Sequence, residues 1–177
     1  MDDTTLVESS FSAKIEAPIE QVDIPTWCFA LPEFEYQQAS PAHNACGTTT
    51  TPDGRRMSIN VEILGGSVMV QHYVEEIGKP DHLRLVSKSD IFTPTGRTKV
   101  GVIWDLSVKK IDAHSCEFTN TVHSSFTPEL LEMIAQQGIP RDVFQANRRP
   151  ISEAHNRQET PCFAKSIERH ALSRTAI

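Results

Sequence analysis

The sequence lacks the features that mark several large classes of protein. No apolar run approaches the roughly 18 residues that a membrane-spanning helix needs. The first ten residues, MDDTTLVESS, are acidic and polar, unlike the basic start and apolar centre of a secretory signal peptide. These absences predict a soluble, cytoplasmic protein that has no membrane partner.

Positive charge is scarce as well. The chain has 17 Lys and Arg against 23 Asp and Glu, which gives a formal net charge of −6. Affinity for nucleic acid comes mainly from neutralising phosphates, so this balance weighs against a nucleic-acid partner. A basic cluster of Arg148, Arg149 and Arg157 is interrupted by Glu153 and does not change that conclusion.

The four cysteines are widely scattered and form no CxxC pair, which excludes a zinc ribbon and a thioredoxin motif. His43 and Cys46 have the spacing of a metal-binding pair, but no second pair accompanies them. No GxSxG nucleophile motif is present either. We therefore expect no metal and no other cofactor.

Residues 43–126 are rich in Thr, Val, Ile and Ser and are interrupted by turn signals such as Thr51-Pro-Asp-Gly54 and Gly65-Gly66. The short connections between these segments indicate antiparallel neighbours. With a first strand at 6–16, the pattern predicts seven strands, the other six at 44–51, 55–64, 67–77, 82–92, 97–109 and 115–126.

Helices are predicted on both sides of this region. Prolines at 18, 25, 32 and 41 allow only two short helices, at 18–30 and 32–39. Thr127-Pro128 predicts a capped helix start, and Gly138 its end. The following pattern is helical to about residue 172, although Pro150 and Pro161 are expected to break or kink the helix.

A seven-stranded sheet must bury one face, and the tail helix is the element large enough to cover it. The sequence therefore predicts one α+β domain over 1–177, with its core at 7–172. In this arrangement a curved antiparallel sheet wraps around a long C-terminal helix, and two short helices follow strand 1. We expect a cavity between sheet and helix.

The order of elements and the opening FSAKIEAPIEQV resemble the SRPBCC superfamily, also called START-like or helix-grip. The segments GTTTTPDGRRMSINVE, VMVQHYVEE and PISEAHNRQETPCFAKSIERHAL resemble one branch of it. The superfamily includes polyketide cyclases and aromatases, lipid carriers, plant hormone receptors and norcoclaurine-synthase-like enzymes. The resemblance implies an interior cavity for a mostly apolar small molecule, and no functional residue is carried over from it.

The strand at 67–77 carries His72 and Tyr73 side by side, one on each face. The alternate set that contains His72 is the more apolar, so His72 is predicted to face the cavity and Tyr73 the outside. A one-residue bulge would exchange them, so both remain candidates. His72 is interpreted as a core histidine bonded to Asn120, as a ligand contact, or as an acid–base catalyst.

His155 and Glu159 are four residues apart and share one face of the predicted tail helix. If that face meets the cavity, the pair could move a proton beside an apolar ligand. The alternative is a solvated pair on a polar helix surface, which the sequence SEAHNRQE favours.

Further candidates come from the inward rows of the strands and from the helices. The predicted ligand contacts are Tyr73, Trp104, Asn120, Phe118, Phe163, Trp27 and Met57.

We expect a cofactor-independent enzyme of cyclase, dehydratase, hydratase or isomerase type, a lyase or isomerase, that acts on a small apolar or aromatic metabolite with His72, His155 and Glu159 as acid–base groups. The alternative is a non-catalytic carrier that uses the same cavity. A third hypothesis is a protein–protein module with a filled interior, which a cavity below about 300 Å³ would favour. Outward Tyr73 and Phe92 leave room for a homodimer.

Overall fold

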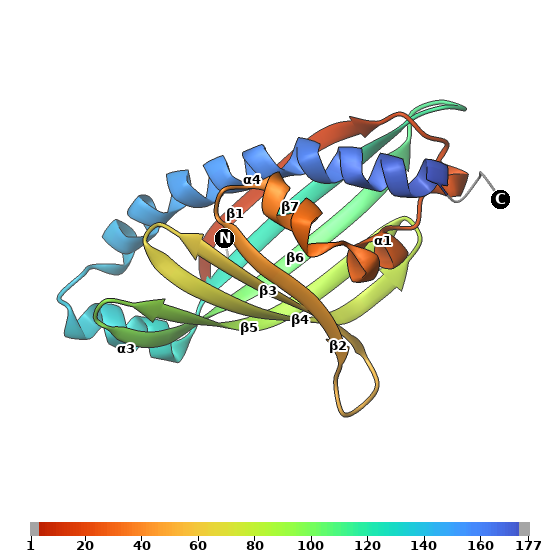
Figure 1. The fold of residues 1–177 in the computed structure, drawn as a ribbon. Coiled ribbons are helices and arrows are strands. Elements are labelled where there is room, and N and C mark those ends of the chain that lie inside the picture. The colour runs from red at the N-terminus through yellow and green to blue at the C-terminus, as the bar shows by residue number, and fades with distance from the viewer. Residues whose placement is uncertain (1–3, 174–177) are drawn as a thin grey trace.

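The protein folds as one curved antiparallel sheet that wraps around a long C-terminal helix, as the computed structural model of residues 4–173 shows (Figure 1). This confirms the predicted α+β helix-grip class. The first strand pairs with the last, so the sheet order is β1-β7-β6-β5-β4-β3-β2. The strands are β1 Thr5–Ile15, β2 His43–Thr50, β3 Arg56–Leu64, β4 Ser67–Lys79, β5 His82–Thr93, β6 Gly96–Lys110 and β7 Cys116–Phe126.

Two glycines form the two-residue connection between β3 and β4. Gly65 and Gly66, between β3 and β4, have φ angles of 60° and 78°. Both angles lie in the left-handed region that a two-residue hairpin turn of type I′ requires and that glycine adopts without steric cost. The hairpin therefore sets Asn60 opposite Gln71 and Glu62 opposite Met69.

The short helices begin where the sequence provides caps. In α1, Ile24–Ala30, the Asp23 side chain accepts a hydrogen bond of 2.9 Å from the Thr26 backbone nitrogen. A 3-10 turn, η1 at Ile19–Gln21, precedes it, and α2 covers Glu33–Ala39. Thr127 caps α3, Pro128–Gln136, in the same way. The predicted helix at 18–30 is thus a turn followed by a shorter helix.

The last helix, α4, runs unbroken from Arg141 to Ser173, about 50 Å at 1.5 Å per residue. Pro150 and Pro161 therefore do not break the helix, and that part of the expectation is wrong, whereas a kink stays a prediction. Each proline removes one hydrogen bond to the carbonyl four residues earlier. Both prolines and the residues with those carbonyls, Ala146 and Arg157, lie on the exposed side of α4, where water can bond the carbonyl oxygens.

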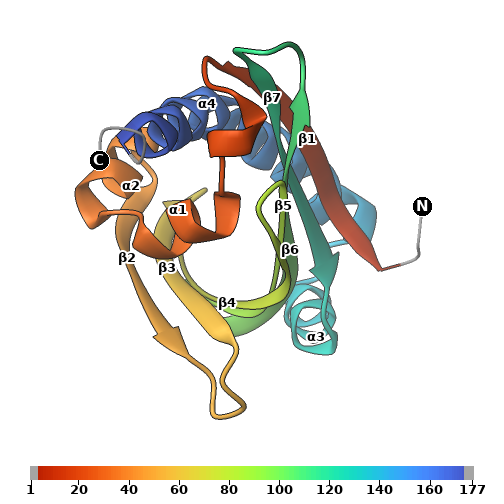
Figure 2. The ribbon, with the colours of Figure 1, turned by 90° about the vertical axis from the view of Figure 1, so that its right-hand side faces the viewer.

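The end-on view shows how these parts enclose an interior (Figure 2). The sheet curls so that β1 and β7 lie far from β2 and β3, and α4 crosses the open side between them. The helices α1 and α2 lie at one end of this arrangement, and α3 lies beside β6. No helix within residues 4–173 is long and apolar enough to cross a membrane.

The sheet faces of β3 and β4 are the reverse of the prediction. In β4, Met69, Gln71 and Tyr73 are buried inside the curve, while His72 lies on the outer face. In β3 the buried set includes Asn60 and Glu62, and Met57 lies on the outer face. The expectations that His72 and Met57 face the cavity are therefore wrong.

This reversal has a physical reason and a consequence. The more apolar alternate set was expected inside, but this part of the interior is polar, and an outer sheet face can be apolar.

Tyr73 is 3 % exposed and cannot support a dimer contact, whereas Phe92 is 44 % exposed. The homodimer stays a prediction.

Candidate functional site

A cavity of about 190 Å³ lies between the concave face of the sheet and the helices α3 and α4. One part of its wall is apolar and is formed by Val100, Val102, Trp104 and Phe163, among others. Exposed Thr95 and Gln137 also line it, so this end reaches the surface.

This volume is below the 300–1,000 Å³ or so of typical ligand pockets. It is close to the roughly 150 Å³ that suffices to hold a benzene molecule in an engineered cavity. By size alone the cavity suits a molecule of about one ring. Its volume is also below the limit of about 300 Å³ under which we expect a protein–protein module with a filled interior. The decision therefore depends on the polar part of the wall.

That polar part is a cluster of five buried or half-buried side chains from four elements. Tyr36 comes from α2, His43 from the start of β2, Glu62 from β3, and His155 and Glu159 from α4. All except His43 line the cavity. The short α2–β2 connection places Tyr36 and His43 so that their rings stack at a centroid distance of 3.9 Å.

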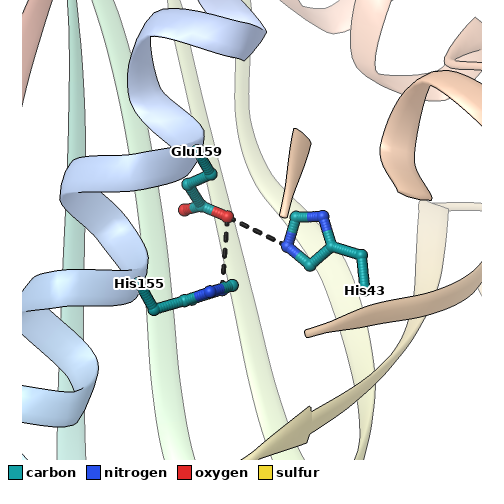
Figure 3. A group of neighbouring side chains, drawn as sticks. All are labelled: His43, His155 and Glu159. Atoms are coloured by element: carbon teal, nitrogen blue, oxygen red, sulfur yellow. Dashed lines mark hydrogen bonds and ion pairs between the residues drawn. The ribbon is translucent and has the colours of Figure 1, made fainter. Parts of the chain in front are cut away.

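Glu159 is the centre of the cluster (Figure 3). Its Oε2 lies 3.1 Å from Nε2 of His43 and 3.3 Å from Nε2 of His155. Its Oε1 accepts a hydrogen bond of 2.9 Å from Nδ2 of Asn120. Both carboxylate oxygens therefore have partners, and Glu159 is only 5 % exposed. His155 and Glu159 do not form the solvated surface pair that the polar sequence around them favours.

Glu62 is a second buried carboxylate in the same cluster. Its Oε1 accepts a 2.8 Å hydrogen bond from the Tyr36 hydroxyl and lies 3.8 Å from Nε2 of His43. Its Oε2 lies 3.7 Å from Nε2 of His155. Burial raises the pKa of the Glu62 carboxyl, since the nearby imidazoles only partly offset the loss of hydration.

The protonation of His43 follows from its neighbours. Its Nδ1 is 2.6 Å from the backbone carbonyl of Tyr36, and because a carbonyl only accepts, Nδ1 must donate. Burial alone lowers the pKa of His43, but the hydrogen bond with Glu159 and the charges of Glu62 and Glu159 outweigh it, so the pKa is raised. These neighbours therefore favour the protonated imidazole ring, whose Nε2–H donates to Glu159.

The partners of Asn120 differ from those expected. Neither His72 nor a ligand satisfies it. Its Oδ1 accepts from Nε1 of Trp104 at 2.9 Å, and its Nδ2 donates to Glu159 and also lies 3.3 Å from Oγ1 of Thr160. Asn120 is fully buried and positions Glu159 from behind, away from the cavity.

Two polar atoms of the cavity wall have no hydrogen-bond partner among the described residues. They are Oε1 of Gln71 and Oγ1 of Thr98, and both side chains are buried. An unpaired buried polar atom costs on the order of 1–3 kcal/mol, so each such atom in a folded protein asks for an explanation. Water or a polar molecule bound in the cavity can supply the missing partners.

A lone cation lines the same cavity. Arg148 is half-buried on α4, two helical turns or about 10 Å before His155. Burial lowers the pKa of its guanidinium, and it forms no ion pair with any described residue. It packs so closely on the β3–β4 turn that a Cβ added at Gly65 would lie 2.6 Å from its Nη1.

The structure sorts the residues named from the sequence into two groups. His155, Glu159, Tyr73, Trp104 and Phe163 line the cavity.

The others lie behind the wall or outside it. Phe118 and Trp27 belong to the core, where Trp27 donates to Oγ of Ser166 at 2.8 Å and packs edge-on against Phe163. Asn120 lies in the second layer, and Met57 and His72 are on the outer face.

Three members of the cluster were missed. Tyr36 lies in the polar segment EFEYQQ, whose composition is typical of a solvated helix, yet it is 1 % exposed. Glu62 belongs to the polar alternate set of β3, which the rule that apolar residues face inward would place outside. His43 was noticed only for its spacing from Cys46, whose sulfur instead lies 3.9 Å from the carbonyl of Leu31. Hairpin pairing of β2 with β3 indicates only that His43 lies near the end of β3 that carries Glu62, and the structure sets the two residues opposite each other.

Comparisons with known proteins identify the fold. No protein-family model and no curated protein matches the chain by sequence. Solved structures do match it. A START superfamily protein from Mycobacterium smegmatis has a TM-score of 0.55 at 14 % identity, with 94 % of this chain and 98 % of that chain covered.

Two enzymes are among the other similar structures. The Zhui aromatase/cyclase from a Streptomyces species has a TM-score of 0.59 at 10 % identity, with 95 % of this chain and 94 % of that chain covered. A Thalictrum norcoclaurine synthase has a TM-score of 0.51 at 11 % identity, with 96 % of each chain covered. At these identities the likeness establishes the SRPBCC-type fold and leaves activity to the site itself.

Proposed function

We propose that this helix-grip protein of the SRPBCC type is an enzyme that encloses a small molecule of about one ring and transforms it at the cluster of His43, His155, Glu159, Glu62 and Tyr36. The reaction class is cyclisation, dehydration, hydration or isomerisation. These are the reactions that oriented proton donors and acceptors beside an apolar pocket assist. The fold shared with an aromatase/cyclase and a norcoclaurine synthase supports this class.

The observation that carries the proposal is the polar wall of an otherwise apolar cavity. Two carboxylates, two imidazoles and a phenol are buried together there, beside unpartnered Oε1 of Gln71. Groups of this kind are costly to bury and concentrate at functional sites. A protein–protein module would have no use for them in its interior.

The polarity of the wall also describes the substrate. A hydroxyl or amino group of the substrate can donate to Oε1 of Gln71, next to the cluster. An acidic group can pair with Arg148, about 10 Å away along α4. The apolar body lies against Val100, Val102 and Trp104. We therefore propose a ring-sized acid with a second polar substituent.

The test begins with native mass spectrometry of protein purified from its own source, to identify a small molecule that copurifies. Turnover and affinity for that molecule are then compared in wild type, Glu159→Gln and the control Glu153→Gln on the same helix. An enzyme is supported if Glu159→Gln reduces turnover by about 10²–10⁴-fold while affinity changes little.

Other outcomes are equally informative. Binding without turnover in wild type supports the alternative, a non-catalytic carrier that uses the same cavity. If no small molecule copurifies and none binds to wild type or to the cluster variants, the protein–protein module is supported. A loss of both turnover and affinity in Glu153→Gln would show that the helix rather than the cluster was disturbed.

A further inference from the structure

The same cluster has the composition and the geometry of a metal centre. One ring nitrogen of His43, one ring nitrogen of His155 and a carboxylate oxygen of Glu159 all lie within 4.8 Å of one another (Figure 3). Two imidazoles and one carboxylate are a ligand set that binds Zn²⁺ and other divalent transition-metal ions in catalytic sites. We propose that the protein binds one divalent transition-metal ion, of the Zn²⁺ type, through these three side chains.

The printed distances fit this proposal. Bonds of about 2.0–2.1 Å to a tetrahedral ion place neighbouring ligand atoms about 3.3 Å apart. Oε2 of Glu159 lies 3.1 Å from Nε2 of His43 and 3.3 Å from Nε2 of His155, so two edges of the tetrahedron already have the required length. The third edge, between the two imidazoles, is at most 4.8 Å and must close by about 1.5 Å or less.

The imidazoles are held in the orientation that a metal ion needs. In metal sites the second ring nitrogen of a ligating histidine usually bonds a carbonyl, a carboxylate or water, which fixes the ring and the tautomer. Nδ1 of His43 donates to the Tyr36 carbonyl at 2.6 Å, and Nδ1 of His155 lies 3.1 Å from Oγ of Ser40. In the neutral imidazole of His43, Nε2 therefore faces the carboxylate with its lone pair. The Ser40 hydroxyl can accept from Nδ1 of His155, an arrangement that leaves Nε2 of His155 free to ligate in the same way.

The carboxylate is held in the same manner. Asn120 donates a hydrogen bond to Oε1 of Glu159 from the core side, so Oε2 faces the imidazoles. A lone pair on Nε2 and a carboxylate oxygen 3.1 Å away repel unless a cation lies between them. A proton can fill this role for one pair, whereas one divalent ion serves Glu159 and both imidazoles together.

The negative charges of the two buried carboxylates also favour a divalent ion. Glu62 brings a second buried carboxylate within 3.8 Å of Nε2 of His43 and 3.7 Å of Nε2 of His155. With neutral imidazoles, the two carboxylates carry two negative charges in a region of low dielectric, and a divalent ion compensates both. Glu62 is thus placed to be the fourth ligand, or to hold a water molecule on the ion at the cavity side, which it lines.

This inference revises the expectation, drawn from the absence of a second His or Cys pair, that no metal is bound. It goes beyond the proposed reaction and does not depend on it, because binding of the ion is measured without substrate. The two are chemically compatible, since a Lewis acid polarises the hydroxyl or carbonyl groups on which dehydrations and hydrations act.

The test uses the full chain carrying no polyhistidine tag. The protein is stripped with a chelator and titrated with Zn²⁺ in competition with a chromophoric chelator, and with Co²⁺ while visible absorption is recorded. We expect one ion per chain with a dissociation constant in the micromolar range or below, and Co²⁺ bands of a four- or five-coordinate site. Metal content of protein purified without added metal provides an independent measurement.

The variants are His43→Gln, His155→Gln and Glu159→Gln, and each is expected to weaken Zn²⁺ binding at least about 100-fold. His82→Gln is the matched control, because His82 also bonds a carboxylate, Asp105 at 3.0 Å, but lies outside the cavity. It should bind Zn²⁺ like wild type.

Thermal unfolding separates lost ligands from lost folding. Zn²⁺ should raise the midpoint of wild type and His82→Gln but not that of folded His155→Gln, since only ligation of the native state shifts the equilibrium. Wild-type protein that binds no Zn²⁺ or Co²⁺ at millimolar concentration would overturn the proposal. The proposed enzymatic function would survive that result if turnover persisted in chelator, so the two can fail separately.

Discussion

Glu159 and His43 are 116 positions apart in the chain, yet Oε2 of the one lies 3.1 Å from Nε2 of the other inside the protein. The contact joins the middle of α4 to the first residue of β2, the strand at the far edge of the sheet from β1. The cluster thus exists only when the helix is seated across the curved sheet. The residues of the site therefore come together only as the protein folds, so a substitution in the site can change stability as well as function.

Asn120 is predicted to contribute strongly to stability. Asn120→Leu leaves Nε1 of Trp104 and Oε1 of Glu159 without their partners in a buried region. We expect a loss of about 2–5 kcal/mol in the free energy of unfolding, because each stranded group forfeits its hydrogen bond at a cost of about 1–3 kcal/mol. Urea denaturation at neutral pH measures it.

A double-mutant cycle with Trp104→Phe assigns the effect. Trp104→Phe removes the indole donor. The part of its destabilisation that comes from the lost Trp104–Asn120 hydrogen bond is already included in the destabilisation caused by Asn120→Leu. The double variant should therefore be less destabilised than the sum of the single variants. Additive losses would mean that the Trp104–Asn120 hydrogen bond contributes little.

Gln71 and His72 are neighbours whose substitutions should have opposite consequences. Gln71→Met replaces a buried amide, whose Oε1 is unpartnered, by an apolar side chain of similar shape. We expect stability to change by less than about 1 kcal/mol, because the amide makes only a long hydrogen bond of 3.5 Å to Glu62. Ligand affinity should fall about tenfold or more, as a polar contact is lost.

His72→Gln is the control on the outer face of the same strand. It should leave ligand affinity unchanged in the same calorimetric or thermal-shift titration. A variant of His72 that abolished binding, alongside a harmless Gln71→Met, would show that the strand faces are assigned the wrong way round.

The sequence predicts the fold well because the fold depends on local signals. Thr127 and Gly138 mark the ends of α3, and Gly65-Gly66 marks a hairpin. Seven strands and a long helix in this order leave few ways to bury the sheet. The alternation of β6 and β7 was also predicted correctly, since Trp104, Phe118 and Asn120 are all buried.

The site was harder to predict because it violates the rule that apolar residues face inward. In β3 and β4 the buried set is polar, with Glu62 and Gln71, and the apolar set is outside. Pro150 and Pro161 do not end α4, because both lie on its exposed side, where water can replace the lost hydrogen bonds.

His43 shows the remaining difficulty. Counting back evenly from Thr50 opposite Arg56 sets His43 opposite Ile63, on the outer face of β3. The register shifts between His43 and Ala45, so that His43 stands opposite Glu62 instead. Nothing in the local sequence indicates that bulge, and it decides whether the imidazole of His43 joins the buried cluster or faces the solvent.

Arg148 is predicted to select acidic ligands. Arg148→Gln removes the cation that lines the cavity without an ion-pair partner among the described residues. Affinity for a ring-sized carboxylic acid should fall about tenfold or more, while affinity for the corresponding neutral amide stays the same, because a charge-assisted hydrogen bond is lost only with the acid.

The adjacent Arg149 provides the control for net charge. It is exposed and does not line the cavity, so Arg149→Gln should bind acid and amide like wild type. Equal weakening of the acid by both variants, removed by added salt, would indicate long-range attraction in place of a contact with Arg148.

The seating of α4 should depend on pH through Glu35. Its carboxylate accepts hydrogen bonds from Oγ of Ser166 and from Nη2 of Arg169, the latter at 2.7 Å, and so joins α2 to α4. Burial acts to raise the pKa of Glu35, but these two bonds and the charge of Arg169 outweigh it, and the pKa lies below the ordinary 4.5.

A lowered carboxyl pKa stabilises the folded state above the unfolded pKa, and this stabilisation is lost as the pH falls through the folded pKa. Glu35→Gln should therefore cost about 1 kcal/mol of unfolding free energy at neutral pH and progressively less below about pH 4.5. Urea denaturation of both proteins between about pH 7 and pH 3.5 measures the difference. Glu33→Gln, an exposed carboxylate on the same helix, is the control and should match wild type within about 0.5 kcal/mol at every pH. A cost for Glu35→Gln that stays constant over this range would show that shape and hydrogen bonding, and not the charge of Glu35, hold the two helices together.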